Sequence, residues 1–313
     1  PEGHGAITAR SKSYLVLAKL FGTGISVFLY LQGFVYYAFA FSAVAEAMCA
    51  LFCAVRMEET EGMTFYKGEL FIKESFRRTK EIIRIGFSVC VKTRSVLYMI
   101  IIDSFCASLI FIVLFLWAIA MKANFGTEQM DFFWYLVVFL IFIASFGGAK
   151  LLEWLNTNYF KKYRTRVPNM TQWNWLVTGC LAISFAILSL GLIKFLNVMN
   201  VYLFMAAIFI VNIGYGFLFP SMDALFNYFI PVEFSEERAT IMSFSQMFRS
   251  MIMTILFYPA AGISGERTII SWMIPAALLF VVTIVVNYLV RRNEKNIGER
   301  SSLNPIVVKG LEE

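Results

Sequence analysis

Long apolar stretches separated by polar segments run along the chain from residue 14 to residue 290. Each stretch is close to the roughly 20 residues that a helix needs to cross about 30 Å of hydrocarbon. No strand-like alternation interrupts them, and lipid offers no hydrogen-bond partners to the backbone, so transmembrane helices are predicted. The eight predicted spans are 14–31, 34–55, 96–121, 132–152, 174–196, 201–220, 239–262 and 268–290. The expected fold class is an all-α, multi-pass membrane protein.

The composition supports this interpretation. Of the 313 residues, 59% are hydrophobic and 15% are charged, whereas soluble domains carry about 25% charged residues. A water-soluble core could not bury so much apolar surface. The chain is therefore expected to have the lipid bilayer as its main partner.

The basic residues predict the orientation, because Lys and Arg in short loops stay on the cytoplasmic side. Of the 27 Lys and Arg, only Lys122, Lys194 and Arg267 fall in loops on one side, and Lys19, Lys150 and Arg249 fall within spans. All the others lie on the opposite side, together with both termini. We therefore expect both termini in the cytoplasm and the protein in the plasma membrane. The basic residues are expected to face anionic lipid headgroups rather than nucleic acid.

The polar segments divide the chain into four parts. Residues 1–55 hold two spans, 56–93 form a long basic cytoplasmic linker, 94–292 hold six spans, and 293–313 form a polar tail that we expect to be largely unstructured. Within the linker, Ile72, Phe76, Ile83 and Phe87 recur at helical spacing among basic residues, which predicts an amphipathic helix on the membrane surface. The alternative is a solvated linker with incidental apolar residues.

The residues that could carry metal or phosphate chemistry are sparse. The five cysteines have no metal-ligand spacing, the chain has one His, and a Gly-rich phosphate loop is absent. Neither a cofactor nor a metal is expected. Intramembrane catalysis would need reactive side chains clustered at one depth, and their scarcity argues against an enzyme.

One passage near the sixth span carries a more specific pattern. Its residues are Pro220, Asn227, Pro231, Glu236, Arg238, Ala239, Thr240 and Ser243. This pattern resembles the helix 10 to helix 11 region in drug-exporter-like branches of the major facilitator superfamily. The resemblance covers about residues 10–292. It implies that the eight spans correspond to helices 5 to 12, that helices 1 to 4 are missing from this sequence, and that Pro231 and Arg238 belong to a cytoplasmic gating loop. The family's Gly-Asp-Arg gating pattern after helix 8 is not present.

Three charged residues are predicted to lie near the middle of the membrane. Asp103 is nine residues beyond Arg94, about 13 Å inward, and Arg249 is eleven beyond Arg238, about 16 Å inward. At this shared depth they could pair. Asp103 would exchange a proton or engage a cationic substrate, with Arg249 tuning it or binding an anionic group; the alternative is a static packing pair. Glu46 is also at mid-depth, on a helix that the resemblance makes peripheral.

Several uncharged polar residues are further candidates for a cavity wall. Asn212 and Tyr215 share a helix face, Gln246 lies nearly one turn before Arg249, and Trp117 belongs to the same span as Asp103. Interhelical hydrogen bonding is the alternative role. Lys150, Glu153 and Asp223 are predicted to lie at cytoplasmic ends of spans, where they would anchor the helices at the interface.

These features together predict a secondary active transporter of a small organic solute. Proton coupling, export and antiport are the finer expectations, and alternating access around a site at the membrane midplane is the expected mechanism. The alternatives are an inactive or partial transporter fragment, or a permease subunit that depends on partner proteins.

Overall fold

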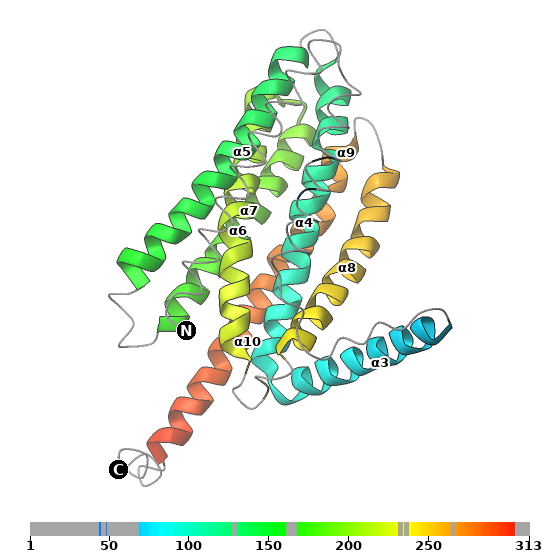
Figure 1. Ribbon diagram of the computed structural model, residues 1–313. Coiled ribbons are helices and arrows are strands. Elements are labelled where there is room, and N and C mark those ends of the chain that lie inside the picture. The colour runs from blue at the N-terminus through cyan, green and yellow to red at the C-terminus, as the bar shows by residue number, and fades with distance from the viewer. Residues whose placement is uncertain are drawn as a thin grey trace.

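The computed structural model describes residues 69–126, 130–160, 168–230, 238–263 and 267–303, together with Val44, Met48 and Phe234 (Figure 1). The two spans predicted at 14–31 and 34–55 lie outside the described residues. The described elements are helical: α3 (Glu69–Lys92), α4 (Arg94–Phe125), α5 (Met130–Trp154) with a π-helical end η1 (Leu155–Phe160), α6 (Pro168–Phe195), α7 (Val201–Phe229), α8 (Arg238–Gly262), α9 (Thr268–Ser271) and α10 (Met273–Leu303).

Length and composition make five of these helical segments able to cross a membrane. They are Arg94–Phe125, Leu136–Asn158, Thr171–Phe195, Val201–Phe226 and Thr268–Arg292. Helix α8 is more polar than these five, but it has 25 residues and packs along α4. The six spans predicted between residues 96 and 290 therefore each correspond to helical structure.

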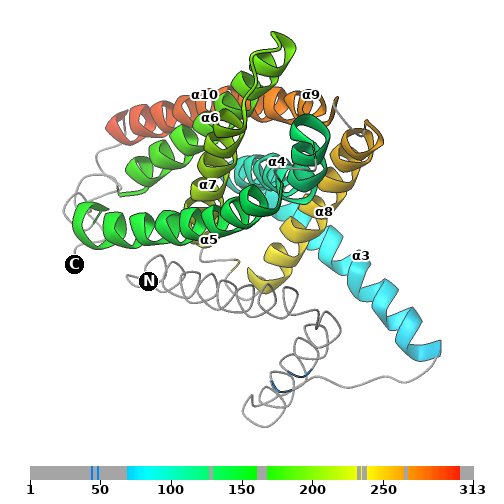
Figure 2. The same ribbon diagram turned by 90° about the horizontal axis from the view of Figure 1, so that it is seen from above.

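Helix α4 forms the centre of the bundle. It contacts α7, α8 and α10, and the view from above shows it enclosed by its neighbours (Figure 2). A helix that is apolar on all faces is suited to such burial, and α4 carries fully buried residues such as Val96, Ile102, Leu109 and Val113 along its length. A charged side chain among these buried positions of α4 consequently lies in the protein interior, whereas Arg94 and Lys122 near its ends are exposed.

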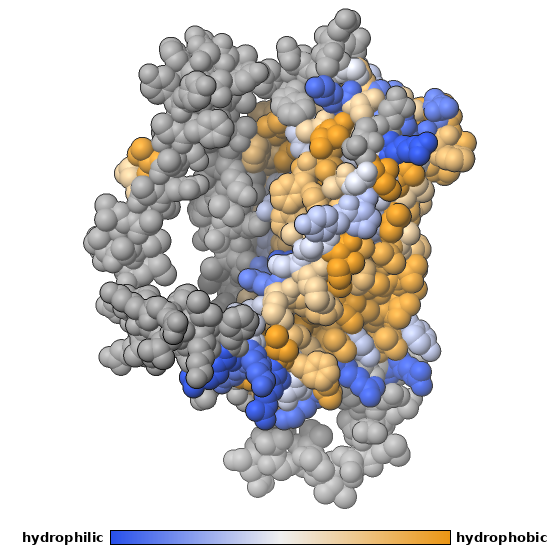
Figure 3. All heavy atoms as spheres, turned by 90° about the vertical axis from the view of Figure 1, so that its right-hand side faces the viewer, coloured by the Kyte–Doolittle hydropathy of each residue, from blue (hydrophilic) through white to orange (hydrophobic). Residues whose placement is uncertain are grey.

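The outer surface of the bundle has the pattern of a membrane protein. Large apolar side chains such as Phe115, Phe185 and Ile255 are more than half exposed. On the face shown in Figure 3, hydrophobic residues form a broad central band, and hydrophilic residues gather above and below it. This distribution matches an apolar belt facing lipid between two polar interfaces.

Three boundaries differ from the sequence-based predictions. Helix α7 does not end at Pro220 but continues to Phe229, because packing against neighbouring helices can compensate for the backbone hydrogen bond that proline removes. The last predicted span is interrupted between α9 and α10, where the Pro275 ring is incompatible with a regular turn. The tail is helical as far as Leu303, so the expectation of an unstructured segment was wrong for residues 293–303, which contain good helix formers such as Glu294 and Lys295.

Helices α5 and α7 pack with their backbones unusually close. A Cβ atom on Gly148 would collide with the backbone carbonyl of Ile213, and one on Gly216 would collide with the carbonyl of Ser145. Small residues permit this approach, and in lipid such packing is a main source of helix association. The α5–α7 pair is therefore joined along a tight backbone contact.

We expect Gly148→Ala to lower the thermal unfolding temperature of the purified protein, because overpacking a close contact costs about 1–3 kcal/mol. Gly147→Ala is the matched control, since a Cβ there would meet nothing within 4 Å. That variant should be neutral or slightly stabilising, because alanine favours helices by about 1 kcal/mol over glycine. Equal unfolding temperatures for the two variants would contradict the assigned contact.

Candidate functional site

A buried carboxylate lies in the N-terminal half of α4. Asp103 is 3% exposed and is surrounded along its helix by buried apolar residues, including Ile100, Ile102 and Cys106. It lies nine residues from the start of α4 at Arg94, about 13 Å along the helix. A charge in such surroundings is costly unless a partner compensates it.

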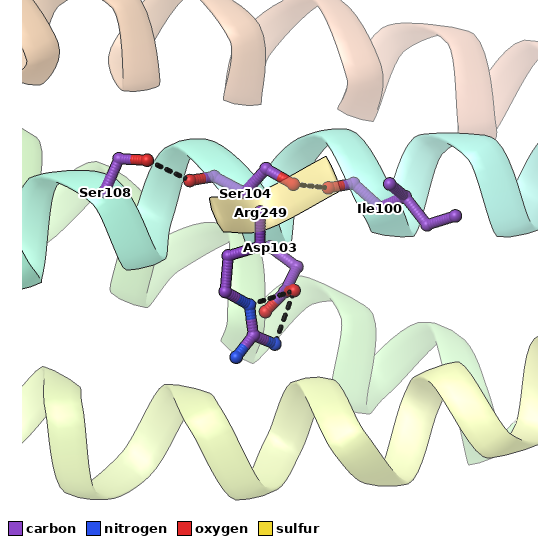
Figure 4. A network of polar contacts seen from close by, with 5 residues as sticks. All are labelled: Ile100, Asp103, Ser104, Ser108 and Arg249. Atoms are coloured by element: carbon purple, nitrogen blue, oxygen red, sulfur yellow. Dashed lines mark hydrogen bonds and ion pairs between the residues drawn. The ribbon is translucent and has the colours of Figure 1, made fainter. Parts of the chain in front are cut away.

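That partner is Arg249 of α8. Its Nε and Nη2 atoms donate hydrogen bonds of 2.8 Å and 2.6 Å to the same carboxylate oxygen, Oδ2 of Asp103. Figure 4 shows the two side chains pointing toward one another across the interface of α4 and α8. The ion pair joins residues that are 146 positions apart in the sequence and fixes the register between these helices.

The second oxygen of Asp103 remains available. Oδ1 is buried and has no hydrogen-bond partner among the described residues. The neighbouring hydroxyls of Ser104 and Ser108 donate instead to backbone carbonyls of α4, at 2.7 Å and 2.6 Å (Figure 4). Oδ1 can therefore accept a hydrogen bond or a proton from a group that enters the site.

An aromatic cluster lies beside the arginine. The guanidinium carbon of Arg249 is 5.4 Å from the ring centroid of Phe219, within the range of a cation–π interaction. Phe219 in turn contacts Tyr215 and Phe111, with centroid distances of 5.1 Å and 5.8 Å. Arg249 is thus held between a carboxylate and an aromatic face, and Phe219 links it to Tyr215.

A small cavity opens at the ion pair. Helices α4, α7 and α8 all contribute to its lining, which consists of Met99, Asp103, Met222, Asp223, Phe226, Met242, Ser245, Gln246 and Arg249. Methionine and phenylalanine supply an adaptable apolar surface, and the polar side chains provide hydrogen-bonding and charged groups. This is the usual composition of a small-molecule site.

The cavity is narrow in this conformation. It has about 20 Å³ of space for the centres of water molecules, and roughly 10–15 Å³ is needed for one water. The cavity can therefore hold about one water molecule beside the ion pair, whereas an organic solute would need α4, α7 and α8 to separate.

The other predicted site residues have different positions. Gln246 lines the cavity. Asn212 is fully buried, donates to the carbonyl of Ile208 at 2.8 Å, and accepts a 3.4 Å hydrogen bond from Ser145 of α5. Trp117 is buried on α4, 14 residues or about 21 Å beyond Asp103, and is not part of the lining. Arg238 begins α8, four residues before Met242 of the cavity lining, and is not itself part of the lining. Glu46 and Pro231 lie outside the described residues.

Asp223 is the principal site residue that the sequence analysis placed wrongly. It was expected at a membrane interface because Pro220 was taken as the end of its helix. Since α7 continues to Phe229, Asp223 lies about two turns inside the helix and lines the cavity with Asp103 and Arg249. Its position eleven residues after Asn212, close to three full turns, could have indicated that it faces inward.

Lys150 and Glu153, three residues apart on α5, form a local ion pair. Lys150 Nζ donates to Glu153 Oε2 at 2.7 Å, and the lysine side chain is 48% exposed. Within the described part of the chain, no group of three His, Cys, Asp or Glu side chains is arranged to hold a metal ion. The polar side chains of the cavity are the Asp103 and Asp223 carboxylates, the Arg249 guanidinium, the Ser245 hydroxyl and the Gln246 amide.

Comparison with known families gives the class of protein. A family model described as Major Facilitator Superfamily matches residues 2–258. The comparisons with curated proteins and with solved structures gave no match. The chain belongs to the Major Facilitator Superfamily, a family of membrane transporters, and it is an integral membrane protein. A small-molecule substrate and membrane lipid are the partners that this class implies.

The buried pair should be energetically coupled. We expect Arg249→Gln to destabilise the protein by about 3–5 kcal/mol, because it leaves the Asp103 carboxylate buried without its cation. The double variant with Asp103→Asn should lose much less stability than the sum of the two single variants. Thermal and denaturant unfolding of the four proteins in detergent measures this coupling.

The exposed pair of Lys150 and Glu153 supplies the control for this comparison of single and double variants. Lys150→Gln should cost no more than about 1 kcal/mol, because solvent-exposed ion pairs contribute little. Strict additivity of Asp103→Asn and Arg249→Gln would contradict an energetic role for the buried pair.

Proposed function

We propose that this protein is a proton-coupled secondary transporter of a small organic solute, with Asp103 as the proton-binding group. The observation that supports this most directly is the arrangement of Asp103: one oxygen is held by Arg249, and the other is without a partner in the described residues beside a cavity that can hold water. A carboxylate in this position can exchange a proton with the water.

Protonation of Asp103 would alter the contact between two helices. The ion pair holds α4 against α8 through charge-assisted hydrogen bonds to Oδ2. A proton on Oδ1 removes the negative charge of the carboxylate and weakens its attraction for Arg249. Separation of α4 from α8 then becomes easier, and the narrow cavity can widen for a solute. Proton binding is thereby linked to the opening movement that alternating access requires.

The cavity wall favours a solute with both polar and apolar groups. Three methionines and Phe226 offer apolar contacts, whereas Gln246 and Ser245 offer neutral hydrogen bonds. We propose Gln246 as a substrate contact, and Tyr215 as a positioning residue that supports Arg249 through Phe219. Asn212 and Trp117 are assigned to helix packing. Arg238 and Pro231 remain candidates for the cytoplasmic gate.

The finer identity follows from the helix 10 to helix 11 pattern between Pro220 and Ser243. We propose membership of the drug-exporter-like branch, antiport of solute against protons, and a location in the cell membrane. In this assignment the described spans from α4 to α10 correspond to helices 7 to 12. Their basic ends, with Arg94, Arg238 and Arg291, face the cytoplasm.

Asp103→Asn should abolish coupling. The full chain is reconstituted in vesicles that contain a pH indicator, and a solute found by thermal-shift screening of a chemical library is added. We expect solute-dependent proton movement to fall at least tenfold in Asp103→Asn, because an amide cannot take up the proton, and to persist partly in Asp103→Glu. Glu153→Gln, which alters an exposed pair, should behave like the parent. An unchanged rate and pH dependence in Asp103→Asn would falsify the assignment.

Variants at Gln246 and Asn212 should distinguish a role in solute binding from a role in helix packing. Gln246→Ala should raise the transport KM about fivefold, the equivalent of one hydrogen bond, with little change in unfolding temperature. Asn212→Ala should lower stability by about 1 kcal/mol, the typical worth of an interhelical hydrogen bond, and leave the KM near the parent value. The reverse outcome would indicate that the solute binds outside the cavity between α4, α7 and α8.

A further inference from the structure

Helix α3 has two faces with apolar side chains. One face packs on the bundle: Val89 and Cys90 are buried, Ile82 and Ile85 pack against the core, and a Cβ on Gly86 would collide with the ring of Phe244 in α8. This contact fixes α3 across the end of the bundle, where the helix extends to one side in Figure 1.

The second face is not covered by the bundle. Ile83, Phe87 and Val91 are 42%, 65% and 64% exposed. Their spacing of four residues places them in one stripe along about two turns of the helix. Such a row of large apolar side chains would be costly in water, and its exposure indicates contact with another apolar phase.

Basic side chains share this stripe. Lys80 and Arg84 are exposed and lie three residues before Ile83 and Phe87, on the same side of the helix. Their alkyl stems can lie along the apolar residues while the charges extend to headgroup level. Figure 3 shows hydrophilic residues gathered at the lower edge of the apolar band, at the height that α3 occupies in Figure 1.

We propose that this face of α3, defined by Lys80, Ile83, Arg84, Phe87 and Val91, binds anionic phospholipids of the adjoining leaflet. The apolar side chains enter the boundary between headgroups and acyl chains, and Lys80 and Arg84 bind lipid phosphates. The alternation of apolar and basic groups along one face suits a charged bilayer surface, where each basic residue gains from the negative potential.

The position of α3 gives this binding a structural consequence. Phe244, which packs on Gly86, lies five residues before Arg249 on the same helix. Lipid bound to α3 therefore holds the beginning of α8, whose middle carries the ion pair with Asp103. The proposal does not rest on the transport function, because lipid binding is measured without any solute.

Depth in the bilayer is tested with tryptophan at neighbouring positions. Phe87→Trp and Ser88→Trp are made in the full chain, whose six native tryptophans contribute equally to both. In vesicles containing phosphatidylglycerol with brominated acyl chains, we expect the added fluorescence of Phe87→Trp to be quenched at least twofold more than that of Ser88→Trp. Equal quenching, or none at position 87, would overturn the proposal and indicate that a protein segment covers this face.

Headgroup selectivity is tested by charge removal. Lys80→Gln with Arg84→Gln should weaken binding of spin-labelled phosphatidylglycerol more than tenfold, since each charge near an anionic surface is worth about fivefold in affinity. Binding of spin-labelled phosphatidylcholine should not change. The matched control is Lys122→Gln with Arg267→Gln, which removes the same charge at exposed positions of the opposite end. Similar losses in both double variants would show a general charge effect and refute a site on α3.

Discussion

The pairing of Asp103 with Arg249 is the constraint on which the arrangement of this bundle depends. An isolated carboxylate or guanidinium inside a membrane protein is strongly unfavourable, so each charge requires the other at one depth. Because Asp103 belongs to the central helix α4, Arg249 must bring α8 against the same part of α4. This explains why α8, which is more polar than the five apolar spans, is held at the site rather than only exposed to lipid.

The contact between α5 and α7 differs in character from the contact between α4 and α8. Helices α5 and α7 meet along Gly148 and Gly216, where backbone approaches backbone and no charge is involved. Close van der Waals packing of this kind contains no group that can gain or lose a proton. The α4–α8 contact, in contrast, depends on an ionisable carboxylate beside a cavity. The bundle therefore combines a helix pair joined by packing with a pair joined by opposite charges, and the proposed proton-linked movement would act on the second pair.

The sequence allowed much of the fold to be predicted. Apolar length located α4, α5, α6, α7 and the last span, because each is close to the thickness of hydrocarbon. The depth count also placed Asp103 and Arg249 at one level, so that their proximity was foreseeable. Helix ends were less predictable. Pro220 was predicted to end a span, but α7 continues past it to Phe229, and this error removed Asp223 from the expected site.

The sequence by itself determined that the protein lies in a lipid bilayer and at what approximate depth its charges lie. Both follow from one-dimensional quantities, which are the length of apolar runs and the rise of a helix. Only the tertiary structure decided which polar residues meet. Asn212 and Asp223 lie on the same helix, yet one bonds across the α5–α7 contact and the other lines the cavity. The two residues share a helix face, so the difference depends on which neighbouring helix lies beside that face at each level, a property of three-dimensional packing that no local pattern contains.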